Sequence, residues 1–333
     1  MRLERVDLAD VDWVLLDALA DRSPFQTRAW LDFLASTQDA RPVVARLRDG
    51  DVDAGWFTGA VVRQAGLWIL GSPFPGWTSG PMGFNLAAGV SRRAAVEALL
   101  DFGLRELRCA HVELLDRRLS FHDLDGLPKA TLDTFTTFEI DLTRDEDALF
   151  GAMSSACRRA LRKGERVGVH VEQASGVEFA DEYYAQLEDV FAKQELRPPY
   201  PVERVRELIR HVEPSGQLLL LRARDAEGES SATAIFPFST AFGYFWGGAS
   251  WRERQSSRPN EAIFWHAMRH LKRVGVPLLD LGGGGEYKRK YGGRAIELPF
   301  VRRSRFAGLM TMRRVAQPIY WRAATRLRRR RSG

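Results

Sequence analysis

Hydrophobic positions alternate along some segments of the chain and recur every three to four residues along others, which predicts strands mixed with amphipathic helices. In the N-terminal half the apolar runs predict strands at 2–6, 41–48, 52–62, 66–71, 111–115 and 134–142. Helical periodicity predicts helices at about 10–19, 23–36 and 91–107. Ser23 and Gln26 have capping-box spacing, with Pro24 at the first helical position.

The C-terminal half repeats this order of elements. Strands are predicted at 167–173, 216–224, 230–238, 241–250, 277–282 and 295–303, and helices at 178–194, 201–212 and 260–274. Each half therefore reads β-α-α-β-β-β-α-β-β, at an offset of roughly 165–175 positions. A repeat of this length predicts a duplicated structural unit of the α/β (α+β) class.

Composition is that of a soluble globular protein, with 45% hydrophobic and 28% charged residues in 333. Two cysteines give no disulfide framework, the start of the chain lacks the apolar region of a signal peptide, and no apolar run is long enough for a bilayer. A cytoplasmic location is expected. The net charge of +6 arises from residues 301–333, which hold eleven arginines and no acids.

A basic segment at 143–166 lies between the halves. Thr143 and Glu146 fit a capping box for a helix that ends near Gly164 or Gly168. Its cations Arg158 and Arg159 either form a solvated helix end or face a cleft that holds an anionic substrate.

The order of strands and helices resembles the GNAT-type N-acetyltransferase fold, present twice, and tandem copies joined by a basic helix resemble the FemAB-like acyltransferases. The resemblance is most specific at "RRALRKGERVGVHVE", "YFWGGAS" and "DLGGGGEYKRKYGG". It implies mixed sheets flanked by helices. The implied parts are a GNAT-like domain at 1–142, a linking helix at 143–166, a second GNAT-like domain at 167–305 and an Arg-rich tail at 306–333.

The same resemblance implies an N-acyltransferase or aminoacyltransferase. Its acceptor would be an amino group of a cell-envelope precursor, such as a peptidoglycan or exopolysaccharide precursor, bound in the cleft between the two domains. "FAKQELRPPYP" and "RPNEAIFWHAM" resemble the branch found near exopolysaccharide genes. No tightly bound cofactor is implied, and the donor would be acyl-CoA or an aminoacyl-tRNA.

The glycine-rich stretch after the strand at 277–282 carries the most distinctive chemistry. By resemblance, Lys288 contacts phosphate and helps to stabilise developing charge, and Tyr287 is the neighbouring catalytic aromatic, while Asp280, Gly283 and Lys290 contribute to substrate binding. The glycines permit close backbone approach, but their spacing is not that of a P-loop. The alternative is a flexible basic loop on the surface.

A second candidate site precedes the helix at 260–274. Arg254 and Arg258 stand before Asn260, and arginines at a helix N-terminus can bind an anion. In the acetyltransferase fold this position holds the donor pyrophosphate, but the usual glycine turn is absent, so both donors stay open. Tyr244 and Trp246 share one face of a strand and belong either to the core or to a cleft wall.

The tail combines arginines with aromatic residues, which suits an anionic membrane surface, at the inner face of the membrane, or RNA. A second hypothesis follows, in which the chain is a catalytically degenerate GNAT-like protein that binds nucleic acid or a membrane through this tail. No metal site is expected, because His266 and His270 lack a third ligand.

Overall fold

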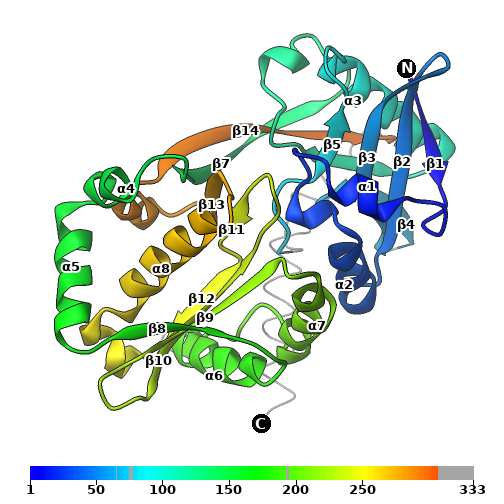
Figure 1. Ribbon diagram of the computed structural model, residues 1–333. Helices are drawn as coiled ribbons and strands as arrows, with labels where there is room; N and C mark the ends of the chain where they lie inside the picture. The colour runs from blue at the N-terminus through cyan, green and yellow to red at the C-terminus, as the bar shows by residue number, and fades with distance from the viewer. Residues whose placement is uncertain (65, 75–77, 193–194, 307–333) are drawn as a thin grey trace.

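The structure is a computed structural model that describes residues 1–64, 66–74, 78–192 and 195–306. Two sheets are flanked by helices (Figure 1). The strands of the N-terminal half are β1 (Arg2–Val6), β2 (Arg41–Asp49), β3 (Val52–Gln64), β4 (Leu67–Ser72), β5 (Gly83–Leu86), β6 (His111–Leu115) and β7 (Thr131–Asp141). Its helices are α1 (Trp13–Asp17), α2 (Arg28–Gln38) and α3 (Arg92–Asp101).

The linking segment and the C-terminal half follow. Their helices are α4 (Glu146–Ala152), α5 (Ser155–Arg166), α6 (Phe179–Ala192), α7 (Val202–Val212) and α8 (Pro259–Arg273). Their strands are β8 (His170–Ala174), β9 (Leu218–Arg224), β10 (Ser230–Pro237), β11 (Gly243–Tyr244), β12 (Gly247–Ser250), β13 (Leu278–Gly283) and β14 (Arg294–Ser304). A 3-10 turn, η6 (Glu286–Tyr291), lies between β13 and β14. None of the helices in the described ranges is both long and apolar enough to cross a membrane.

The two halves exchange strands. The larger sheet has the order β1-β2-β3-β4-β6-β14-β7-β13-β11, with β5 beside β3, and the smaller sheet has the order β12-β10-β9-β8. Strand β14 crosses from one half to the other (Figure 1) and pairs with both β6 and β7, while β7 pairs with β13. One continuous sheet therefore joins the halves. The domain limits expected from the sequence stay a prediction.

A shared hydrophobic core also joins the halves. Trp30 and Phe33 of α2 belong to the same buried cluster as Tyr183 of α6, Leu208 of α7 and Ile235 of β10. Helix α2 packs directly against α7. Removal of these side chains from water favours a fixed arrangement of the two halves.

The helix starts differ from the expected ones in two places. The predicted capping box of Ser23 and Gln26 is present, but it closes a short 3-10 turn, η1 (Pro24–Gln26), and α2 begins only at Arg28. The predicted box of Thr143 and Glu146 is wrong. Asp145 caps α4 instead, because its carboxylate accepts the Ala148 N–H at 2.7 Å, while the Thr143 hydroxyl donates to Asp141.

Candidate functional site

The two sheets separate in the middle of the segment that was predicted as one strand at 241–250. Its first part, β11, pairs with β13, and its second part, β12, pairs with β10. The Phe245 N–H donates to the Asp280 carbonyl at 2.8 Å, whereas the Trp246 N–H donates to the Ile235 carbonyl at 3.0 Å. Two successive residues therefore bond to different sheets, and the prediction of a single strand is wrong.

The glycine-rich end of β13 lies at this point of divergence. Gly282 has a φ of +74°, and a Cβ atom there would lie 3.0 Å from the Tyr244 hydroxyl, so only glycine fits without strain. The Tyr244 ring packs edge-on against Phe25 of the N-terminal half, with ring centroids 4.9 Å apart. Tyr244 thus contacts both the glycine segment and the junction between the halves.

Lys288 extends from η6 back to the glycines. Its Nζ donates to the carbonyl oxygens of Gly282 at 3.1 Å and Gly283 at 2.5 Å, and the residue is only 6% exposed. Burial lowers the pKa of Lys288, and the nearby Asp280 opposes this shift. An ammonium group has three donors, so one N–H remains for a ligand. Tyr287, by contrast, is exposed.

A cavity of about 420 Å³, here called the basic pocket, lies between α5, the start of α8 and η6. Its lining residues are Ser154, Ala156, Cys157, Arg159, Ala160, Lys163, Arg258, Glu261 and Lys290. Lys290 pairs with Glu261 at 2.8 Å. Four cations and one carboxylate leave the wall with a formal charge of +3. This pocket brings together three of the residues predicted from the sequence: Arg159, Arg258 and Lys290.

Other predicted binding residues bond elsewhere in the protein. The Arg158 guanidinium donates to the Gly151 and Met153 carbonyls, the Arg254 guanidinium pairs with Asp225, and the Asn260 amide donates to the Ser250 hydroxyl. Trp246 packs against Tyr200, with ring centroids 5.2 Å apart, and is 9% exposed. These side chains therefore hold helix ends, loops and the core in place.

A second cavity of about 370 Å³, here called the junction pocket, lies between the halves. Its lining residues are Asp21, Ser23, Pro81, Met82, Phe84, Asp116, Arg117, Arg118, Glu139, Ala241, Phe242, Arg294 and Ile296. Three carboxylates and three guanidinium groups line it. The cavity can therefore take a ligand with groups of both signs.

Arg117 connects the halves at this pocket. It follows β6, and its guanidinium donates to the Asp280 carboxylate at 2.7 Å and to Glu139. It also lies over the Phe242 ring, 4.8 Å from the centroid. Asp280 is fully buried, and its carboxylate also accepts a hydrogen bond from the Thr137 hydroxyl. The Asp280 side chain therefore helps to hold the two halves together. Arg117 was not among the residues predicted from the sequence, although it lies two residues after the end of β6, and ligand sites of α/β sheets occur at strand ends.

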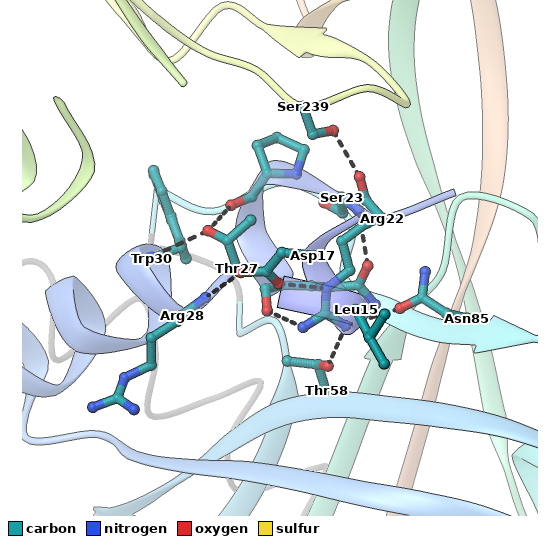
Figure 2. A network of polar contacts seen from close by, with 12 residues as sticks. Leu15, Asp17, Arg22, Ser23, Thr27, Arg28, Trp30, Thr58, Asn85 and Ser239 are labelled. Carbon is teal, nitrogen blue, oxygen red and sulfur yellow. Dashed lines mark hydrogen bonds and ion pairs between the residues drawn. The ribbon is translucent and has the colours of Figure 1, made fainter. Parts of the chain in front are cut away.

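A buried arginine orders the neighbouring wall of the junction pocket. Arg22 is 0% exposed, and its Nη1 donates to the Thr58 hydroxyl at 3.0 Å and to the Asn85 amide oxygen at 2.9 Å (Figure 2). Burial lowers the pKa of this guanidinium to about 10, although the Asp17 carboxylate opposes the shift. The Ser239 hydroxyl of the C-terminal half donates to the Arg22 carbonyl at 2.6 Å. The network therefore fixes one half against the other.

The two pockets lie on opposite faces of the larger sheet. Phe138 of β7 and Leu281 of β13 belong to the hydrophobic cluster that also contains Cys157, which lines the basic pocket. Alternate side chains of a strand point to opposite faces. Glu139 and Asp280, next to those apolar residues in the sequence, accordingly meet Arg117 at the junction pocket.

All of the Arg-rich tail after Phe306 lies outside the described residues. The expected binding of a membrane or of nucleic acid through the tail therefore stays a prediction.

Comparisons with known proteins agree with the fold. Residues 152–290 match the family model described as "Acetyltransferase (GNAT) domain". Similar solved structures include FemX, with a TM-score of 0.70, 12% identity, and coverage of 90% of this chain and 96% of that one. No curated protein matches the sequence.

Two further structures resemble the chain over most of its length. A tandem GNAT protein from the clavulanic acid biosynthesis pathway has a TM-score of 0.53 and 14% identity, covering 91% of this chain and 98% of that one. L-PGS from Bacillus licheniformis has a TM-score of 0.52 and 11% identity, covering 89% and 91%. Likeness at such low identity concerns the fold, and the predicted tandem GNAT fold is confirmed. Residues 152–290 thus form an acetyltransferase (GNAT) domain, and the chain as a whole has a tandem GNAT fold similar to the structure of FemX.

Proposed function

We propose that the protein is an N-acyltransferase that takes an acyl group from acyl-CoA and transfers it to an amino group of a cell-envelope or polysaccharide precursor. The observation that carries the proposal is the basic pocket, whose wall has a formal charge of +3 and includes Arg258 at the start of α8. The phosphates of coenzyme A need such an anion site, and helix N-termini favour it. The GNAT match over residues 152–290 supports the same donor.

The junction pocket is proposed as the acceptor site. Residues of both halves line it, and its carboxylates suit an amine. The donor phosphates would bind on one face of the sheet and the acceptor on the other, so the acyl carbonyl would lie where the sheets diverge, beside Lys288. The structural neighbours FemX and L-PGS support an acceptor of the cell envelope. An aminoacyl-tRNA donor finds no comparable support in the comparisons.

A donor and acceptor screen tests the proposed function. Purified protein is incubated with acetyl-CoA, succinyl-CoA or long-chain acyl-CoA and, in parallel, with aminoacylated tRNA, against amine-bearing muropeptides and amino sugars. Mass spectrometry is expected to detect an acylated amine only with acyl-CoA. Transfer from charged tRNA alone would contradict the donor assignment, and no transfer from any donor would contradict the function.

Neutralising the basic pocket should weaken donor binding. Arg258→Met or Lys163→Met is expected to raise the KM for acyl-CoA about 10- to 100-fold, because a charge-assisted hydrogen bond contributes about 1.5–3 kcal/mol. Steady-state kinetics and calorimetry with coenzyme A measure the effect. Arg166→Met is the matched control, since Arg166 lies on α5, as Lys163 does, but is exposed and does not line the pocket. An unchanged KM in both pocket variants would place the phosphates elsewhere.

A further inference from the structure

Glu139 of β7 presents one carboxylate oxygen to the junction pocket. Its Oε1 accepts a hydrogen bond from Arg117 Nη2, while Oε2 accepts none from the described part of the chain. The side chain is 12% exposed. Arg117 therefore fixes the orientation of the carboxylate and leaves its second oxygen available to a ligand in the pocket.

The charges around Glu139 keep its carboxylate available as a proton acceptor. Arg117 is shared with Asp280, so two carboxylates compete for one guanidinium. Burial raises the pKa of Glu139, and Asp280 adds to this shift, whereas Arg117 and Arg294 oppose it. Arg294 of β14 is the cross-strand neighbour of Glu139. The other charged groups that line this pocket are Asp21, Asp116 and Arg118.

Glu139 also lies close to the place proposed for the acyl carbonyl. The Gly283 carbonyl accepts a hydrogen bond from the Lys288 ammonium, and Gly283 is the cross-strand partner of Thr137 of β7. Thr137 and Glu139 are two residues apart on one strand, so their side chains share a face at a spacing of about 7 Å. An amine bound at Glu139 would thus lie within reach of a carbonyl beside Lys288.

We propose that Glu139 binds the acceptor amine in the junction pocket and takes a proton from its nitrogen during transfer. This assignment rests on the proposed acyltransferase function. The amine nitrogen attacks the carbonyl carbon of the thioester, so a C–N bond forms. The nitrogen becomes more acidic and gives its proton to Glu139, and the C–S bond breaks. Coenzyme A leaves as the thiolate and is protonated by solvent, and Glu139 returns its proton to solvent through the pocket. Arg117 is a positioning residue, because it acts only by orienting Glu139.

The test is the Glu139→Gln variant, with Glu139→Asp beside it. Glutamine can still accept the Arg117 hydrogen bond but cannot take the proton, so kcat/KM for the amine is expected to fall about 100-fold. Aspartate is expected to recover part of that loss. In the wild type, kcat/KM for the amine should increase with pH through the raised pKa of Glu139 and then level off. This increase should be missing in Glu139→Gln.

Two measurements separate this assignment from a structural role and from the proposed function. Coenzyme A binding and the melting temperature should be unchanged in Glu139→Gln, as in the control Glu297→Gln, an exposed glutamate of β14. If the wild type acylates amines and Glu139→Gln keeps more than half of its kcat/KM, the assignment is wrong while the function stands. If the wild type acylates no amine, both are wrong.

Discussion

Replacement of Lys288 by methionine is expected to lower kcat for acyl transfer by about 10²- to 10³-fold. The ammonium is held by the Gly282 and Gly283 carbonyls and keeps one N–H for the oxyanion that forms as the amine attacks. Loss of a preorganised donor to such an oxyanion has an effect of this size. The methionine side chain is unbranched and similar in length to the apolar stem of lysine. The change therefore removes the donor with little change in packing. Single-turnover kinetics with acyl-CoA measure the chemical step directly.

The control for Lys288 is its neighbour in the same turn. Arg289 is exposed, pairs with Glu286 on the surface and lies over the Phe138 ring, 5.4 Å from the centroid. Methionine can keep the contact with the ring, so Arg289→Met should leave kcat within about twofold. The KM for acyl-CoA should stay unchanged in both variants, because neither side chain lines the basic pocket. A Lys288→Met protein that is folded and has a wild-type kcat would show that the ammonium only holds the glycine segment.

The sequence was sufficient for most strands and helices, because their periodicity is local. The helix predicted at about 91–107 does begin as α3 directly after Ser91, and the repeated order of elements did predict two similar units. The exchange of β7 and β14 could not be predicted in the same way. An alternating pattern specifies that a strand has one buried face, but it does not specify which neighbour the strand bonds to.

The residues of the candidate site also differ in whether a local sequence pattern could predict them. Lys288 and Lys290 were suggested by a local motif, and the structure then separates them: one ammonium reaches the glycine carbonyls and the other reaches Glu261. Arg117 and Glu139 gave no such signal, because each looks like an ordinary charged residue at a strand end or along a strand. Their importance arises from contact with Asp280, which is distant in the sequence.

Replacement of Arg117 by methionine is expected to lower the free energy of unfolding by about 3–5 kcal/mol. The change leaves the fully buried Asp280 carboxylate without the guanidinium that pairs with it, and removing one partner of a buried ion pair has a cost of this order. Because Asp280 lies in the sheet that both halves share, the loss should appear in one cooperative transition. Urea denaturation followed by tryptophan fluorescence and by circular dichroism measures it.

Two further variants test whether the unpaired charge is the cause. The Arg117→Met/Asp280→Asn double variant removes the carboxylate charge as well, so it should regain at least half of the lost stability, because an amide has no charge to desolvate. Arg118→Met, next in the chain, should change stability by no more than about 0.5 kcal/mol, since its side chain is largely exposed and lies 4.0 Å from Asp21. A double variant no more stable than Arg117→Met would contradict the argument, and the loss would then lie in the packing of Arg117 over the Phe242 ring. A change in m-value would instead indicate that the halves unfold separately and that Arg117 holds them together.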